Sequence, residues 1–193
     1  CNLDGTGLEM FAWGLRNPFG VMWSPDGKLY VADNGFDEGG SRPIANAPDA
    51  IWMVKQGAWY GFPDYAAGVP VTDKRFKPKD GPQPEFIMEK HPPVEQPFVT
   101  RPPHAATTKM DFARREFGFE GQMFLAEFGE ATPVTGQPVG PRGHQVVRID
   151  PKSKQVEMFA RTKKSALGPK DFEYVATAGL KRPMDVRFSP DGS

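Results

Sequence analysis

The fold is decided by the stretch Gly14-Leu-Arg-Asn-Pro-Phe-Gly-Val-Met-Trp-Ser-Pro-Asp-Gly-Lys-Leu-Tyr-Val-Ala-Asp-Asn-Gly35. Near the other end of the chain it recurs in a less regular form, Gly179-Leu-Lys-Arg-Pro-Met-Asp-Val-Arg-Phe-Ser-Pro-Asp-Gly192. Each copy has a proline that ends a loop, a short apolar run and a Ser-Pro-Asp-Gly turn. Recurrence of one supersecondary unit is typical of repeat folds. The sequence therefore predicts part of a β-propeller.

The first copy predicts a β-hairpin with strands at 21–23 and 29–32. Between them lies the Pro25-Asp-Gly27 turn, in which Pro presets φ and Gly accepts a positive φ. A divergent third copy occupies the middle of the chain. The other strands are expected at 108–112, 123–128, 145–149 and 186–188. This pattern predicts an all-β protein with long loops between its hairpins.

Propellers close with four to eight four-stranded blades, and a chain of 193 residues holds about two to three of them. Residues 1–193 are therefore expected to form a partial propeller domain that is truncated at both ends. The first residues resemble the end of a strand followed by a turn, and the chain stops directly after the last Ser-Pro-Asp-Gly turn. We expect further blades on both sides.

Composition excludes several classes of partner. Lys and Arg number 24, and so do Asp and Glu, so no net charge favours nucleic acid or an anionic membrane surface. No apolar run is long enough to span a bilayer. Cys1 is the only cysteine, which rules out an internal disulfide and a cysteine-based metal cluster.

Residues 63–103 stand apart because they contain ten prolines. Proline fixes φ and removes a hydrogen-bond donor, so this segment is expected to be a loop excursion across the surface, with a strand possible only at 85–88. His91 lies in it and is expected to face solvent. Loops of this length within compact domains are usually functional.

Arg16 and Asn17 are the first candidates for chemistry. They lie at the mouth of the first strand, where propeller loops surround the central channel, and they offer a planar cation beside an amide. Such a pair suits a planar anion with several oxygens. On residue types alone, a loop cap at Arg16 and an ordinary Asn-Pro turn explain the pair as well.

The loop that follows the second strand is rich in oxygen donors and glycine. It reads Asp33-Asn-Gly-Phe-Asp-Glu-Gly-Gly40, and Asp49 comes shortly after it. Carboxylate and carbonyl oxygens suit Ca²⁺. The spacing differs from that of an EF-hand, so a solvated turn is the alternative interpretation.

Three further side chains are candidates for the channel. His104 precedes the middle hairpin at the position equivalent to Arg16, and an imidazole there can act as an acid, a base or a structural donor. Lys109 and Arg142 are cations that either point into the channel or face water. The sequence contains neither a nucleophile elbow nor a zinc-hydrolase motif.

These residues resemble the glucose/sorbosone dehydrogenase family, the soluble PQQ-dependent sugar dehydrogenases. The likeness lies in the 14–35 stretch, in Asp49-Ala-Ile-Trp-Met-Val54 and in Gly57-Ala-Trp-Tyr-Gly-Phe-Pro-Asp64. The later segments His104-Ala-Ala-Thr-Thr-Lys-Met-Asp-Phe112, Phe124-Leu-Ala-Glu-Phe-Gly129 and Gly143-His-Gln-Val-Val-Arg-Ile149 are similar to the sorbosone dehydrogenase branch.

The resemblance implies a six-bladed propeller with PQQ across the channel mouth. It implies that Arg16 and Asn17 hold the quinone together with other channel cations, for which Lys109 and Arg142 are candidates by position only. It also implies a Ca²⁺ ion that polarises the quinone, with Gly35 and Phe36 as backbone-carbonyl ligands and Asp49 nearby. Arg16 would then stabilise negative charge on the reduced quinone. The resemblance suggests a periplasmic or secreted protein.

The sequence also departs from the family pattern. The family has an Asp-Glu pair where this chain has Asp49-Ala50, so one carboxylate is missing near the expected metal. The loop between Gly35 and Asp49 is longer than in the glucose-oxidising members. The family's general base is a His of an earlier blade, and His104 is expected only to line the site.

Three functions remain open on the sequence. The first is oxidation of a sugar or related polyol-aldehyde by hydride transfer to PQQ with Ca²⁺ assistance, followed by electron transfer to an acceptor. The second is a propeller without cofactor that binds carbohydrate or protein. The third is a Ca²⁺-dependent lactone hydrolase, which requires oxygen ligands that converge from several blades.

Overall fold

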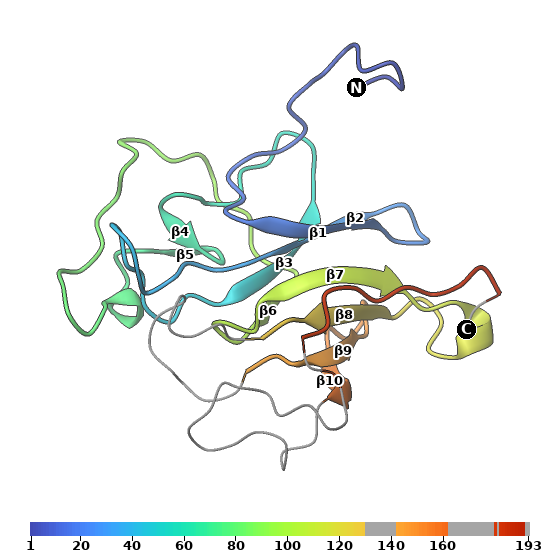
Figure 1. Cartoon of the computed structure of the whole chain (residues 1–193). Coiled ribbons are helices and arrows are strands. Elements are labelled where there is room, and N and C mark those ends of the chain that lie inside the picture. The colour runs from blue at the N-terminus through green and yellow to red at the C-terminus, as the bar shows by residue number, and fades with distance from the viewer. Residues whose placement is uncertain (130–141, 162–179, 181, 192–193) are drawn as a thin grey trace.

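The computed structural model describes residues 1–129, 142–161, 180 and 182–191 (Figure 1). Within them two four-stranded antiparallel sheets form the body of the protein, with strand orders β1-β2-β3-β6 and β10-β9-β8-β7. The first sheet consists of β1 (Pro18–Trp23), β2 (Leu29–Asp33), β3 (Asp49–Val54) and β6 (Val99–Arg101). The second consists of β7 (Thr107–Phe112), β8 (Met123–Glu127), β9 (Gln145–Ile149) and β10 (Val156–Arg161).

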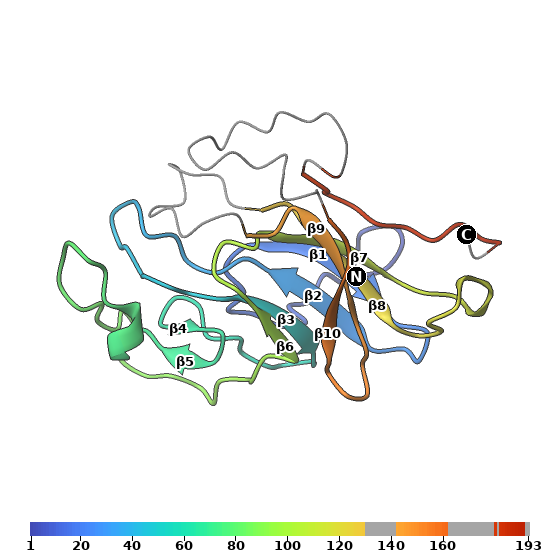
Figure 2. The same ribbon diagram turned by 90° about the horizontal axis from the view of Figure 1, so that it is seen from below.

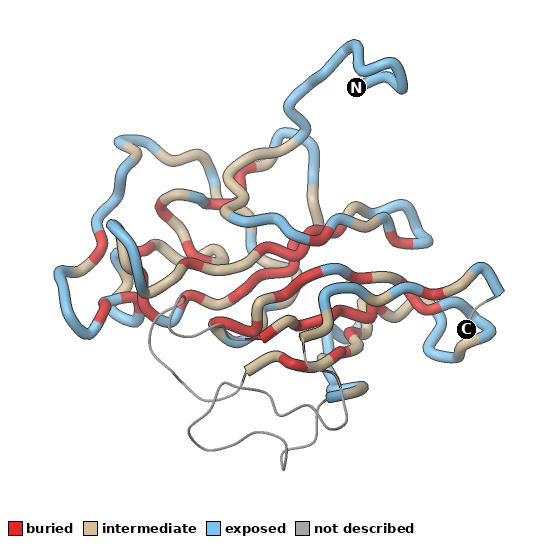
Figure 3. Tube along the Cα trace, viewed as in Figure 1, coloured by how far each residue is buried: buried red, intermediate tan, exposed pale blue. Residues whose placement is uncertain are grey.

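The two sheets pack face to face, and the main core lies between them (Figures 1 and 2). Buried residues predominate in β2, β3, β7, β8 and β9, whereas the N-terminal arm and the β1–β2 turn are mostly exposed (Figure 3). The buried core residues are Tyr30, Ala32 and Ile51 of the first sheet and Met110, Phe112, Met123, Leu125, Val147 and Ile149 of the second. Burial of side chains of this size contributes about 1.5–3 kcal/mol each.

The first strands of the two sheets, β1 and β7, approach each other closely at Gly20. A Cβ atom at that position would lie 2.2 Å from the carbonyl oxygen of Thr108, so only glycine permits this approach. Residues 183–188 then run along the other side of β7, where the Lys109 amide donates to the Met184 carbonyl over 3.4 Å. Corresponding segments of the three sequence repeats therefore lie side by side.

The predicted hairpin turn is confirmed. The Ser24 amide donates to the Lys28 carbonyl over 2.8 Å, and Gly27 has a φ of +77°. The Ser24 hydroxyl also donates to Asp26 Oδ1 over 2.5 Å, which closes the turn from its side-chain side. The strands predicted in the middle copy and at 145–149 are confirmed as β7, β8 and β9.

Two predicted strands are wrong. Residues 186–188 are not a strand, because no described strand pairs with them and the Phe188 amide donates to the Asp111 side chain instead. Residues 85–88 are irregular, because the Ile87 and Met88 amides donate to the Asp64 carboxylate. Within the Pro-rich segment the strand that joins the first sheet is β6, which pairs with β3 from Asp49 to Ile51.

The Pro-rich segment is folded around Asp64, whose side chain is fully buried. The segment carries the short strands β4 (Tyr65–Ala66) and β5 (Val69–Pro70) and the 3-10 helix η1 (Lys74–Phe76), and a second 3-10 helix, η2 (Arg115–Phe117), follows β7. The expectation that His91 faces solvent is wrong. Its ring stacks on Trp59 at 5.6 Å, and its Nε2 atom lies 2.9 Å from Asp64 Oδ2.

In the described part of the chain, neither 3-10 helix is long or apolar enough to cross a membrane.

Candidate functional site

The strand register brings most of the predicted site residues to one end of the two sheets. Pro18 lies opposite Asp33, and Asp49 lies opposite Arg101 in the first sheet. Thr107 lies opposite Glu127 in the second. The loops that leave these strand ends include residues 34–48 and 102–106. The predicted site residues other than Lys109 and Arg142 therefore lie along a single edge, in the loops or at the strand ends.

The Arg16 guanidinium is held by the loop after β2. Its Nη1 donates to the Gly35 carbonyl, and its Nη2 forms an ion pair with Asp37 Oδ2 at 2.7 Å. The guanidinium also lies 5.6 Å from the centre of the Phe36 ring. The side chain remains 25% exposed, so it is accessible to a ligand as well as anchored.

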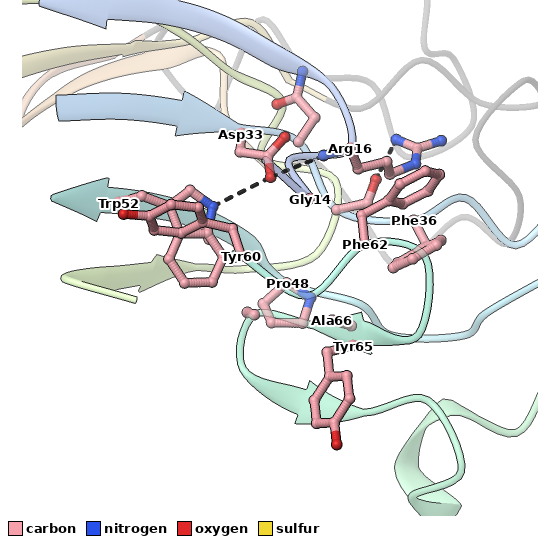
Figure 4. A pocket seen from close by; sticks show the side chains of 14 residues that line it. Gly14, Arg16, Asp33, Phe36, Pro48, Trp52, Tyr60, Phe62, Tyr65 and Ala66 are labelled. Atoms are coloured by element: carbon pink, nitrogen blue, oxygen red, sulfur yellow. Dashed lines mark hydrogen bonds between the residues drawn. The ribbon is translucent and has the colours of Figure 1, made fainter. Parts of the chain in front are cut away.

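The backbone on either side of Arg16 is fixed by the end of β2. The amides of Arg16 and Asn17 both donate to the Asp33 carboxylate, and the Asn34 amide donates to the Asn17 carbonyl over 3.1 Å. Figure 4 shows Asp33 between the Arg16 backbone and the Trp52 indole, with the Arg16 side chain directed toward Phe36 and Phe62. Asn17 itself is exposed.

Asp49 connects the two sheets. Its Oδ1 accepts the Gly35 amide at 2.8 Å, and its Oδ2 accepts the Thr107 amide at 3.1 Å. Burial, together with the nearby charge of Glu127, raises the pKa of Asp49 to about 7, and the backbone hydrogen bonds oppose this shift. Gly35 allows the close approach, since a Cβ there would lie 2.6 Å from the Ala47 carbonyl oxygen.

A second buried carboxylate lies next to Asp49. Glu127, at the end of β8, is paired with Arg101 Nε of the first sheet at 2.5 Å and accepts Gln145 Nε2 at 2.7 Å. Its side chain is 0% exposed. The Thr107 hydroxyl completes the contact between the sheets by donating to Asn34 Oδ1 over 3.2 Å.

His104 lies in the loop that enters β7. Its side chain is 4% exposed, and its Nε2 atom has no hydrogen-bond partner within the described structure. The nearest carboxylate oxygen is Glu38 Oε1 at 3.9 Å, which is beyond hydrogen-bond distance. His104 and Ala106 have φ angles of +63° and +52°, a conformation that is rare outside glycine and common at functional sites.

Lys109 and Arg142 are not brought to Arg16 by any interaction that the structure shows. Lys109 points from β7 to Asp185, with its Nζ atom 3.5 Å from Oδ2, and its side chain is 45% exposed. Arg142 is partly exposed just before β9. Residues 136–141 of the loop predicted to carry Arg142 lie outside the described residues.

A model of the family described as glucose / sorbosone dehydrogenase matches residues 2–152 of this chain. The chain belongs to this family. The match covers the first sheet, the Pro-rich segment and most of the second sheet. All the candidate residues, from Arg16 to Arg142, lie within it. No curated protein matches the chain.

Solved structures similar to this member of the glucose/sorbosone dehydrogenase family support the fold. The apo form of the soluble aldose sugar dehydrogenase of Escherichia coli aligns with a TM-score of 0.56 and 20% identity, over 98% of this chain and 44% of that one. The holo form of the pyranose dehydrogenase PQQ domain of Coprinopsis cinerea gives 0.57 and 20%, over 94% and 50%. A calcium structure of the Trichoderma reesei family AA12 protein gives 0.55 and 16%, over 94% and 49%.

The predicted fold class is confirmed, and the two four-stranded sheets are two propeller blades. The chain spans half or less of the length of these three structures. It therefore carries only some of the elements that those proteins contain.

The donor set fits an anionic quinone better than it fits a free cation. Arg16 and the exposed Asn17 present a guanidinium and an amide at the loop edge. The Gly35 carbonyl is already bonded by Arg16, and both Asp49 oxygens accept backbone amides. In the part of the chain that is described, no group of three or more His, Cys, Asp or Glu residues is placed to hold a metal ion.

The structure adds residues that the sequence did not single out. The sequence pattern places Asp33 among possible metal ligands, whereas its oxygens accept hydrogen bonds from three N–H groups. The same pattern identifies Glu127 only as part of a strand and Arg101 only as part of the Pro-rich segment. A signal was present in principle, because a carboxylate at the last position of an apolar strand needs a buried partner.

Proposed function

We propose that this chain contributes the quinone-binding edge of a sugar dehydrogenase that oxidises a sugar or related polyol-aldehyde with PQQ. Membership of the glucose/sorbosone dehydrogenase family supports an oxidoreductase of this type. The observation that carries the proposal is the placement of Arg16 and Asn17. Both are fixed at the loop edge by Asp33, with the guanidinium anchored but still 25% exposed.

The quinone, when bound, supplies a two-electron acceptor for hydride. Arg16 provides a planar cation with several N–H donors, which stabilises negative charge on a nearby oxygen. Asn17 offers both an amide donor and an acceptor, which orient a polar planar ligand. The Gly35 carbonyl holds the guanidinium at the loop edge, and the Asp37 carboxylate pairs with it while no ligand is bound. Lys109 and Arg142 remain predicted contacts of the quinone.

Calcium belongs to the proposal through the family resemblance. Gly35, Phe36 and Asp49 remain the predicted ligands or neighbours of that ion. Because Arg16 and the backbone amides already engage the oxygens of Gly35 and Asp49, these residues alone do not form a cation site, and no chemical step is derived through Ca²⁺. A periplasmic or secreted location also remains a prediction.

Replacement of Arg16 by alanine tests the proposal. If the guanidinium stabilises the reduced quinone, R16A lowers kcat/KM by about 100-fold, on the order of 3 kcal/mol of transition-state stabilisation. The measurement is dye reduction by aldoses with the purified protein reconstituted with PQQ and Ca²⁺. R75A is the matched control, because Arg75 carries the same charge on the surface of the Pro-rich segment and is 60% exposed.

A change of less than twofold in R16A would reject the role assigned to Arg16. Absence of both PQQ binding and dye reduction in the unaltered protein would reject the dehydrogenase proposal. Carbohydrate binding by such an inactive protein would favour the binding-module alternative. Ca²⁺-dependent lactone hydrolysis by such a protein would favour the lactone hydrolase alternative.

A further inference from the structure

Asp33 is a buried carboxylate that accepts three hydrogen bonds. Its Oδ1 accepts the Asn17 amide at 2.7 Å, and its Oδ2 accepts both the Arg16 amide at 3.3 Å and Trp52 Nε1 at 3.2 Å. The residue is 7% exposed. All three donors are N–H groups, and two of them belong to consecutive backbone positions. The Arg16 amide and the Trp52 indole both approach Asp33 in Figure 4.

The position of Asp33 explains why a side chain is needed there. The β1–β2 ladder ends where Pro18 pairs with Asp33, so Arg16 and Asn17 lie beyond its last pair. Proline lacks an N–H, so the chain at this point has no ladder donor of its own. The Asp33 side chain instead accepts the amides of Arg16 and Asn17, the two residues before Pro18. These bonds fix the backbone of the loop next to the end of the strand.

The three N–H donors around Asp33 require the ionised form of its carboxylate. Burial raises the pKa of Asp33, and the hydrogen bonds from Asn17, Arg16 and Trp52 together with the charge of Arg16 oppose that shift. An ionised carboxylate accepts all three N–H groups at once, and charge-assisted bonds of this kind are stronger than neutral ones. A carboxamide of the same shape would turn one N–H toward another N–H.

We propose that Asp33 is the positioning residue of the quinone-binding edge, which fixes the backbone of Arg16 and Asn17 so that their side chains meet the ligand in one orientation. Asp33 does not touch the ligand itself. This inference rests on the proposed function for the identity of the ligand. The fixation of the two amides can be measured without any ligand.

The first experiment is amide hydrogen exchange of Arg16 and Asn17 in the protein without cofactor. Asn17 is exposed, so slow exchange of its amide depends on the bond to Asp33. D33N is expected to accelerate exchange of both amides by about tenfold or more, since a charge-assisted bond is lost. D26N is the control, because Asp26 lies in the same hairpin and carries the same charge but contacts Ser24 and Lys28 at the opposite end.

The second experiment is a PQQ titration followed by steady-state kinetics with an aldose. D33N is expected to raise the dissociation constant of PQQ by about tenfold and to lower kcat as well, while D26N remains within about twofold of the unaltered protein. A merely structural role would lower the melting temperature of D33N without this change in PQQ affinity.

The outcomes separate the two proposals. Fast exchange of the Asn17 amide in the unaltered protein would overturn the role of Asp33, and this measurement remains decisive if D33N does not fold. Equal effects of D33N and D26N on exchange or on PQQ affinity would overturn it too. Slow Asn17 exchange that D33N abolishes, in a protein that does not bind PQQ, would uphold the fixation of the loop and reject the quinone.

Discussion

At the scale of single residues, Arg16 has two anionic partners, Asp37 in the structure and the quinone in the proposed function. In the structure its guanidinium is paired with Asp37, while the proposed function gives it to the quinone. The pair is partly solvated, with 25% and 41% of the two side chains exposed. Ion pairs of this kind contribute about 0–1 kcal/mol to stability, so Arg16 can change partner at little cost.

Removal of the Asp37 charge is therefore expected to favour the ligand. D37N should leave the free energy of unfolding within about 1 kcal/mol of the unaltered protein and tighten PQQ binding by about two- to fivefold. Fluorescence titration with PQQ measures the affinity, and urea unfolding measures the stability. Weaker PQQ binding in D37N would mean that Asp37 helps to hold Arg16 in its productive position.

At the scale of elements, the Pro-rich segment is organised by one carboxylate. Asp64 accepts hydrogen bonds from Arg42, from the amides of Ile87 and Met88, and is bonded to His91. Burial would raise the pKa of Asp64, but these bonds outweigh it and the pKa is lowered. The ionised form is thus favoured in the folded protein.

The lowered pKa gives the stability a defined dependence on pH. The contribution of Asp64 is complete above the ordinary Asp pKa of about 3.9 and is lost as the pH falls through the lower folded value. D64N should lower the free energy of unfolding by about 3 kcal/mol near neutral pH. It should also reduce the loss of stability that occurs as the pH falls. Urea unfolding as a function of pH is the measurement. An unchanged loss of stability at acid pH in D64N would contradict this prediction, and D80N, at an exposed aspartate of the same segment, is the control.

The sequence predicted elements well where the causes are local. The Ser-Pro-Asp-Gly turn and its flanking apolar runs act over a few residues, and the strands on either side were found. His91 and β6 were missed because their surroundings come from Asp64 and β3, which are distant in the chain. Residues 85–88 have an apolar pattern, but the amides of Ile87 and Met88 donate to the Asp64 carboxylate and not to a neighbouring strand.

The candidate site divides in the same way. Arg16 and Asn17 could be singled out because their motif stands next to a recognisable strand. The partners of Asp33 and Glu127 could not be predicted, since each depends on which N–H groups from other elements reach it. The proximity of His104 to Glu38 could not be predicted either, because it depends on how the two blades are placed relative to each other.

At the scale of the whole molecule, Arg101 and Glu127 join the two blades through a buried ion pair. The side chains are 14% and 0% exposed, so removal of one partner leaves a charge without compensation. R101M should destabilise the protein by about 3–5 kcal/mol, whereas R101M/E127M should cost clearly less than the sum of the two single changes. Chemical denaturation of the double-mutant cycle tests this coupling. Additive effects would show that the pair does not connect the blades energetically.

The adjacent residues Asp37 and Glu38 face two different blades, one at the Arg16 guanidinium and the other 3.9 Å from His104 Nε2. A redesigned 34–48 loop would consequently alter both candidate side chains in a single step. Exchange of the whole loop for that of a homologue is expected to change the surroundings of Arg16 and His104 together, whereas a substitution at Asp37 alone changes only those of Arg16.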